Sequence, residues 1–291
     1  MPCAMSGGLA LGSILLCVSC MHTPRSSDRT LATAPPPADS ATVILWRMDE
    51  SGGDHVLDDG PFHIDAIAGN DTRAGFGRLN SARHFSRSIQ SFIYAPYAPA
   101  LDLPTALTIE AWVLPEVFGS YEDTPLVTRW TERANEQSWI FGITGVNIGA
   151  STLDVQNPGY HRALVQRALI GHLMFAIQPE NAGRPLSYFS VAQIELNRWT
   201  HVAVTYDGEL VRFYINGRLD SQHALKNRIR QTQAPLLAGN YFDPHWLTEF
   251  GGVLNVSAAF DQTPYYAFVG MIDDLRISNV ARSEFPGTGR K

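Results

Sequence analysis

Residues 199–218, WTHVAVTYDGELVRFYINGR, constrain the fold of this chain more than any other segment. Two runs rich in Val, Phe, Tyr and Thr flank Asp207-Gly208, and the second run ends at Asn216-Gly217. Asp-Gly and Asn-Gly pairs favour tight hairpin turns, because Gly lacks a Cβ atom and Asn and Asp tolerate positive φ angles. The pattern therefore predicts three consecutive antiparallel strands at residues 199–206, 209–215 and 218–223.

Similar short runs recur along the chain, separated by turns rich in Gly, Pro, Asn and Asp. We find no repeat, no heptad pattern and no long helical pattern. Short strands without helical crossovers between them predict an all-β fold, a sandwich of antiparallel sheets. The other predicted strands are residues 42–48, 63–68, 82–85, 91–94, 107–114, 126–130, 138–143, 172–178, 187–194, 234–239 and 267–277.

Four segments resemble a known family. Residues 199–217 resemble the signature of laminin-G-like, concanavalin A-like jelly-roll domains. They contain, in order, a Trp, His-Val-Ala, Tyr-Asp-Gly and Tyr-Ile-Asn-Gly. LTIEAWVLP at 107–115 resembles an early central strand of that family, GMIDDLRISNVAR at 270–282 its closing strand, and LWRMDE at 45–50 its opening. The resemblance implies a two-sheet antiparallel jelly-roll sandwich. Because lectins, glycan hydrolases, adhesion modules and structural domains share this fold, function must be argued from a site.

Composition agrees with one large β domain and argues against nucleic acid as a partner. The chain has 291 residues, of which 45% are hydrophobic and 17% charged. The formal net charge is −6, and no long basic run occurs. Binding to phosphates needs a clustered cationic face, which this sequence does not offer.

The first twenty residues predict export. Residues 9–18 form an apolar run that is too short to span a bilayer and suits a signal peptide. Cys17-Val18-Ser19-Cys20 resembles a bacterial lipoprotein box with Cys20 as the acylated residue, although no Lys or Arg precedes the run. An ordinary cleaved signal, or a misassigned start, is the alternative. We expect a cell-envelope protein of the outer membrane or periplasm, attached to a membrane only through a lipid.

The expected domain organisation follows from this. Residues 1–20 are the signal peptide and lipobox, and residues 21–41, rich in Pro, Ser, Thr and Ala, are a flexible tether. Residues 42–283 are the laminin-G-like sandwich, and residues 284–291 are a C-terminal tail. The remaining cysteines, Cys3 and Cys17, also precede the domain, so it contains no disulfide.

Acidic residues at the two ends of the domain suggest a cation. Asp49 follows the first strand, Asp58 and Asp59 lie in the next turn, and Asp274 lies in the last strand. The first and last strands of a jelly roll tend to be neighbours, and the family resemblance implies a structural Ca²⁺ held by these four residues. The alternative is that Asp273 or Asp274 merely binds backbone N–H groups or an Arg. Strand alternation would send Asp273 and Asp274 to opposite faces, so only one could join a cluster.

The sequence carries no catalytic motif that we recognise. Retaining glucanases of this superfamily place an acidic pair on one strand, with carboxyls about 5 Å apart. Glu110 is followed two residues later by Trp112, and Glu132 and Glu136 have Ala134 midway between them. Neither segment therefore has the acidic pair of these glucanases. Gly-x-Ser-x-Gly and phosphate-binding loops are missing as well, and His201 is interpreted as a structural residue. We therefore assign no catalytic residue.

The aromatic insertion at residues 241–266 is the candidate ligand site. Aromatic faces stack on sugar rings while carboxylates bind hydroxyls, so Tyr241, Asp243, Trp246 and Tyr265 are predicted to contact a ligand. The alternative is that these aromatics fold inward as a small core that anchors the long loop.

These observations favour an exported, non-catalytic module that binds an extracellular glycan or a protein surface. The alternatives are a glycan-active hydrolase and a purely structural protein of the cell envelope. Two carboxylates lining a cleft about 5–10 Å apart would favour the hydrolase, and an exposed aromatic platform without them would favour the lectin-like module.

Overall fold

The computed structural model describes residues 36–119, 123–131, 133, 135–145, 170–243, 247–250, 253–256 and 266–285. These residues belong to one compact unit, Ala32–Lys291. The predicted signal peptide, Cys20 and the first part of the tether lie outside the described residues. No helix in the described part of the chain is long and apolar enough to cross a membrane.

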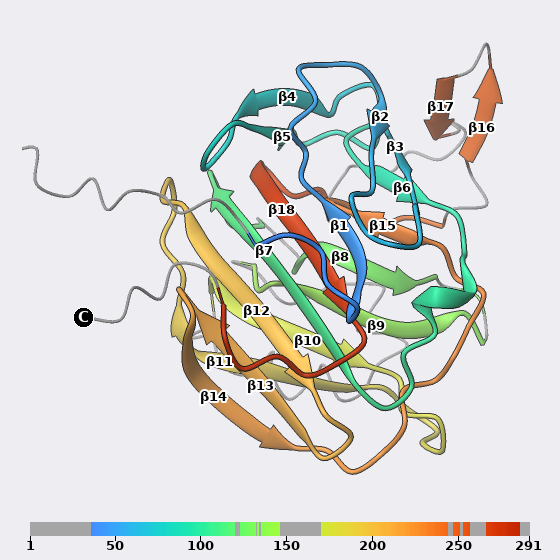
Figure 1. The fold of residues 1–291 in the computed structure, drawn as a ribbon, viewed down its shortest axis with the longest axis vertical. Helices are drawn as coiled ribbons and strands as arrows, with labels where there is room; N and C mark the ends of the chain where they lie inside the picture. Colours follow the sequence, from blue (N-terminus) through green and yellow to red (C-terminus); the bar gives the residue numbers. More distant parts are fainter. Residues whose placement is uncertain are drawn as a thin grey trace, which may run out of the picture. The chain divides into compact units, whose positions relative to one another are not determined.

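The described strands form two antiparallel sheets of eight strands each (Figure 1). The first sheet contains β4 (Arg73–Phe76), β5 (Ser81–Phe85), β18 (Gly270–Ser278), β7 (Leu107–Pro115), β12 (Thr200–Tyr206), β13 (Leu210–Ile215) and β14 (Arg218–Ala224), with β1 (Thr42–Trp46) paired to β18. The second contains β2 (His55–Val56), β3 (Ala66–Ala68), β6 (Ile93–Ala95), β15 (Leu236–Ala238), β8 (Thr124–Trp130), β9 (Gln137–Ile143), β10 (His172–Ile177) and β11 (Leu186–Gln193). A short 3-10 helix, η1 (Pro99–Leu101), and a hairpin of β16 (Leu247–Phe250) and β17 (Val253–Val256) complete the described elements. The predicted two-sheet jelly-roll sandwich is confirmed.

The hairpins that the sequence predicted form one side of the first sheet. β12 pairs with β13, and β13 pairs with β14. Asn216 and Gly217 both have positive φ angles, 50° and 71°, as a primed turn requires. Gly208 has a φ of 90°, and the Asp207 carboxylate accepts hydrogen bonds from the N–H groups of Glu209 and Leu210. Local turn chemistry therefore sets the register of these three strands.

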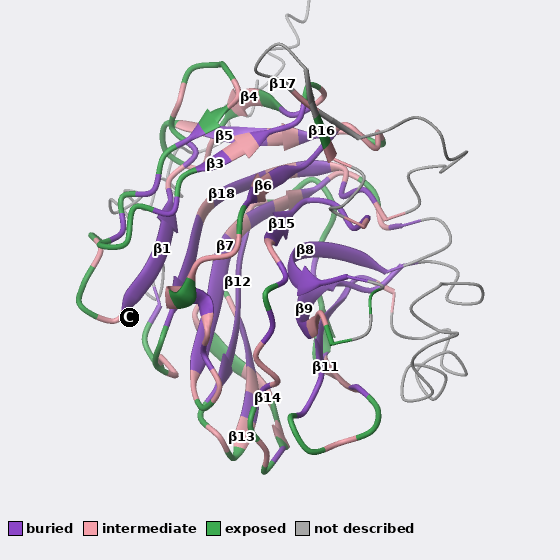
Figure 2. Cartoon of the chain, turned by 90° about the vertical axis from the view of Figure 1, so that its right-hand side faces the viewer, coloured by how far each residue is buried: buried purple, intermediate pink, exposed green. Residues whose placement is uncertain are grey.

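The core lies between the two sheets and receives large side chains from both. Trp46 and Phe85 come from the first sheet, and Trp139 and Phe175 come from the second; all four are almost fully buried. Figure 2 shows the buried strands as two layers. Burying aromatic side chains of this size is the main source of stability in a sandwich of this kind.

Three short elements differ from the prediction. β4 lies within the Gly-rich segment 69–77, where the sequence predicted no strand, and its sequence, RAGF, has no β-branched residue. Its strand geometry comes from pairing with β5 at the edge of the sheet. β2 and the β16–β17 hairpin were also not predicted. Neighbouring strands, and not local propensity, determine elements this short.

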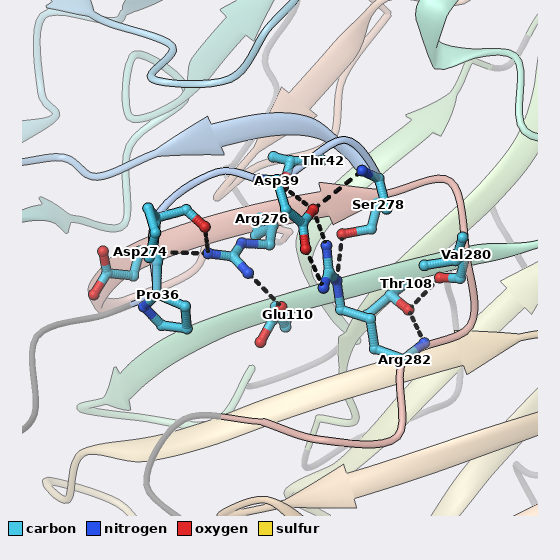
Figure 3. Close-up of polar contacts among 12 residues, drawn as sticks. Pro36, Asp39, Thr42, Thr108, Glu110, Asp274, Arg276, Ser278, Val280 and Arg282 are labelled. Carbon is cyan, nitrogen blue, oxygen red and sulfur yellow. Dashed lines mark hydrogen bonds and ion pairs between the residues drawn. The ribbon is translucent and has the colours of Figure 1, made fainter.

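Residues 36–41, which we call the N-terminal strap, are held beside β18 by arginine side chains, among them Arg276 and Arg282 (Figure 3). Arg276 donates hydrogen bonds to the carbonyl groups of Pro36 and Pro37. Arg282 binds both carboxylate oxygens of Asp39, at 2.6 and 2.9 Å, and this ion pair holds the pKa of Asp39 well below its usual range. The prediction of a flexible tether therefore does not hold for residues 36–41.

The predicted C-terminal boundary is also too early. Phe285, which we placed in the tail, is 4% exposed. Its ring packs against Tyr214, with ring centroids 4.7 Å apart, and against His201 at 5.6 Å. The folded domain therefore extends at least to this residue.

Candidate functional site

Asp58 is a structural acceptor for the backbone. It is 5% exposed, and its carboxylate accepts hydrogen bonds from the N–H groups of Leu45, Gly60 and Ile64, each at 2.8 Å. These bonds fix the turn after β1 against the strand. Backbone N–H groups therefore occupy this carboxylate, which the sequence predicted as a cation ligand.

Asp273 and Asp274 lie at a bulge in β18. Ile272 and Leu275 both lie in the core. In a regular strand, residues three positions apart would point to opposite faces. The register with β7 shifts between Asp273 and Arg276, and Asp274 has a positive φ of 49°. The extra residue turns both aspartates away from the core, so the expectation that alternation separates them is wrong.

Burial and repulsion between carboxylates raise two pKa values at this bulge. Burial, the charge of Asp274 and the charge of Asp49 raise the pKa of Asp273 to about 7. Burial and Asp49 raise the pKa of Asp274 to about 6, although Arg47, 3.3 Å away, opposes this shift. The adjacency of β1 and β18 thus brings three carboxylates into one another's field.

Asp273→Asn should raise stability at alkaline pH. Because the folded pKa lies above the unfolded value, the ionised carboxylate destabilises the fold, and this cost grows as pH rises from about 4 to 7. The amide oxygen of Asn can still accept the hydrogen bond from the N–H of Arg78. We expect the free energy of unfolding to rise by roughly 1–2 kcal/mol at pH 8 and to change little near pH 4.

Urea unfolding of both chains in EDTA at the two pH values measures this effect. A variant that is less stable than the wild type at pH 8 would show that the Asp273 carboxylate is needed in its charged form.

The predicted Ca²⁺ ligands fit a cation only in part. Asp58 uses its carboxylate for backbone bonds, and Asp59 binds the guanidinium of Arg47 at 3.1 Å. Arg47 also contacts Asp274, so a guanidinium already neutralises part of this cluster. Within the residues that the structure describes, no group of three or more His, Cys, Asp or Glu side chains is arranged to hold a metal. Asp49 and Asp274 are the remaining carboxylates that an ion could join.

Glu110, the acidic residue of β7, has a structural environment. It is 3% exposed, and its carboxylate lies 3.1 Å from Nε2 of His201 and 3.9 Å from Nη1 of Arg276. Pro36 of the strap lies beside this cluster (Figure 3). Its carboxylate is enclosed and already paired, as is typical of a structural residue.

The described part of the aromatic insertion packs inward. Tyr241 is 5% exposed and joins Trp130, Ile140 and Met174 on the second sheet, with Tyr266 against its ring at 5.3 Å. An enclosed Tyr241 cannot stack on a ligand. The carboxylate of Asp243 pairs with Arg133 at 3.4 Å, and its side chain is 12% exposed. The other two predicted contacts, Trp246 and Tyr265, lie outside the described residues.

A groove of about 520 Å³ opens at one end of the sandwich. Residues 51–54, between β1 and β2, form one side of it. The end of β3 at Ala68 and the following residues 69, 70 and 72 form another. The start of β4, Arg73 and Ala74, completes the lining. The groove combines exposed polar groups with the small side chains of Gly and Ala, so it offers hydrogen-bonding groups in an open cleft.

A buried arginine fixes one wall of the groove. Arg83 of β5 is 0% exposed and donates hydrogen bonds to the carbonyl groups of Gly53 at 2.8 Å and His55 at 2.7 Å. It also contacts the carboxylate of Glu50 at 3.2 Å. Because three positions of the loop share one rigid donor, the wall is preorganised before any ligand binds.

A family model described as "Concanavalin A-like lectin/glucanases superfamily" matches residues 88–284, which is more than half of the chain. This chain belongs to the concanavalin A-like superfamily. The match covers the strands from β6 to β18. A comparison with curated proteins gives no match.

Several solved structures share this fold at low sequence identity. The binding domain of Paraclostridial Mosquitocidal Protein 1 has a TM-score of 0.56 and 13% identity, over 83% of this chain and 49% of that chain. The binding domain of botulinum neurotoxin serotype G has a TM-score of 0.54 and 13% identity, over 83% of this chain and 48% of that chain. Domain 4 of an extracellular arabinanase from Geobacillus stearothermophilus, solved in complex with arabinotriose, has a TM-score of 0.51 and 17% identity. The match covers 82% of this chain and 93% of that domain. The chain thus spans about half of the toxin chains but nearly all of the arabinanase domain.

The groove of this concanavalin A-like domain was not predicted from its sequence. Its lining residues are small or polar and come mostly from turns, which in a single sequence look like ordinary connections. The one available signal was the density of Gly and Asn at residues 51–53 and 69–77. Gly69 shows the constraint, because a Cβ atom there would lie 2.2 Å from the carbonyl oxygen of Gln90.

Proposed function

We propose that this chain is an exported, non-catalytic module that binds an extracellular glycan in the groove between residues 51–54 and β4. The observation that carries the proposal is the groove itself, an open polar cleft with one wall fixed by Arg83. Such a cleft can offer fixed hydrogen-bonding groups to sugar hydroxyls without losing conformational entropy. The fold supports it, because an arabinanase domain of nearly the same extent is known in complex with arabinotriose.

The other parts of the proposal concern attachment and metal. We include acylation at Cys20, so that the tether presents the domain at a membrane surface, and a structural Ca²⁺ beside Asp49 and Asp274. Membrane fractionation of the wild-type and Cys20→Ser chains checks the anchor. A protein surface as ligand remains the second candidate, because the same groove could receive a peptide loop.

Filling the groove should abolish binding. A Cβ atom at Gly52 would meet no atom within 4 Å, so Gly52→Trp places a large ring at the cleft without a clash in the fold. Gly183→Trp is the matched control, since Gly183 has equally open surroundings and does not line the groove. We expect Gly52→Trp to lower glycan affinity at least tenfold, about 1.4 kcal/mol, with both melting temperatures unchanged.

The readout is a glycan panel measured by thermal shift and calorimetry, with EDTA and with Ca²⁺. Equal binding by the wild type and Gly52→Trp would place the ligand elsewhere. A melting temperature insensitive to EDTA would remove the Ca²⁺ from the proposal. Absence of any glycan binding by the wild type would leave the protein-surface candidate.

A further inference from the structure

We propose that Phe76 is a stacking platform beside the groove, and hence that the ligand is an oligosaccharide that extends from the groove onto this ring. The inference rests on the proposed function of the groove and adds the length of the ligand to it. It also names a residue that makes the protein prefer a chain of sugars to a single sugar.

Phe76 is the most exposed large apolar side chain that the structure describes. It is 90% exposed, and it lies at the end of β4. A ring that packs on nothing contributes little to folding and leaves its apolar faces in water. Because the ring lies beside a polar cleft, it can contact a ligand that is bound there.

The register of β4 places Phe76 next to the groove. β4 pairs with β5 without a register shift, from Arg73 opposite His84 to Phe76 opposite Ser81. Side chains two positions apart on a regular strand point to the same face, so Phe76 shares a face with Ala74, which lines the groove. At the rise of a strand the two residues are about 7 Å apart, so the ring adjoins the groove without belonging to it.

The turn after β4 holds Phe76 in place. The N–H of Gly77 donates to the carbonyl of Asn80 at 3.1 Å, and the side chain of Asn80 donates to the carboxylate of Asp49 at 3.0 Å. Asp49 also accepts a hydrogen bond from the N–H of Ser81. These bonds fix the backbone that carries the ring, so a ligand that stacks on it has to order only the side chain.

The two surfaces are chemically complementary to successive sugars. The groove supplies the carboxylate of Asp54 and the guanidinium of Arg73, which can bind hydroxyl groups. The face of Phe76 suits the apolar C–H face of a pyranose or furanose ring. A single sugar can contact only one of these surfaces at a time, whereas a longer chain reaches both and binds more tightly.

The test compares the wild type with Phe76→Ala, using soluble mono-, di-, tri- and tetrasaccharides of arabinose, xylose, glucose and N-acetylglucosamine. We expect the wild type to bind a tri- or tetrasaccharide more tightly than its monosaccharide. Phe76→Ala should lower the affinity for the longer sugars about tenfold and leave that for the monosaccharide unchanged. Phe76→Tyr should restore the affinity, since it keeps the aromatic face.

Val191→Ala is the control, because Val191 is 74% exposed on β11, at the edge of the other sheet. Neither alanine variant should change the melting temperature. Equal affinities of the wild type and Phe76→Ala for a trisaccharide would overturn the inference and leave the groove function intact. No binding of any of these sugars by the wild type overturns both. A lower melting temperature for Phe76→Ala alone would mean that the ring is structural, which also overturns the inference.

Discussion

Asp58→Ala should lower the free energy of unfolding by about 3–5 kcal/mol, because three buried N–H groups lose their acceptor together. The carboxylate of Asp58 binds the N–H groups of Leu45, Gly60 and Ile64, and nothing else in the described turn could replace it without moving the backbone. The substitution also weakens the contact between this turn and β1, where the backbones of Trp46 and Asp58 form an isolated antiparallel β-bridge.

Asp58→Asn separates the hydrogen bonds from the charge. Its amide oxygen can still accept from Leu45 and Gly60, while its NH₂ group would face the N–H of Ile64. We expect a loss about half that of Asp58→Ala. Urea unfolding in EDTA and in Ca²⁺ gives the comparison. If EDTA lowers the wild type to the stability of the Ala variant, Asp58 acts as a metal ligand and our structural role for it is wrong.

Arg129→Met should cost a similar amount, about 3–5 kcal/mol, because it removes a fully buried donor from several acceptors. The guanidinium binds the carbonyl groups of Leu101, Thr232 and Ala234 and the carboxylate of Asp102. Burial lowers the pKa of Arg129, and Asp102 opposes that shift. The one side chain thus joins β8 to η1 and to the segment before β15.

Arg129→Lys keeps the charge but not the planar set of donors, so we expect it to recover only part of the loss. Arg184→Met, at an exposed arginine, is the control and should change the free energy of unfolding by less than about 0.5 kcal/mol. Denaturant unfolding measures all three. A loss below about 1 kcal/mol for Arg129→Met would mean that water satisfies the carbonyl groups.

The sequence predicted the elements whose geometry is set by neighbouring residues. Asn216-Gly217 requires a tight turn wherever it stands between β-rich runs, and the structure has that turn. The bulge at Asp273 and Asp274 could not be predicted, because it depends on how β18 meets β1 and β7 at once. The spacing of three between Ile272 and Leu275 breaks the apolar alternation, but this break alone does not distinguish a bulge from the end of a strand.

The candidate site was harder to predict than the fold for a related reason. Aromatic residues in a long insertion suggested ligand contacts, yet Tyr241 packs on the second sheet because a buried ring gains more than an exposed one. The groove consists of residues without distinctive chemistry, and only its shape makes it a candidate. Phe76 stands in a segment that resembled a loop, so its exposure could be recognised only once β4 was in place.

The N-terminal strap decides where mechanical load enters the domain. A pull on the preceding chain reaches residues 36–41 first, where Asp39 pairs with Arg282 and Pro36 with Arg276, before it reaches the hydrogen bonds between β1 and β18. Asp39 is about half exposed, so salt weakens its pair with Arg282. Ionic strength would therefore tune how readily these contacts detach under force, while the β1–β18 ladder keeps the sandwich closed.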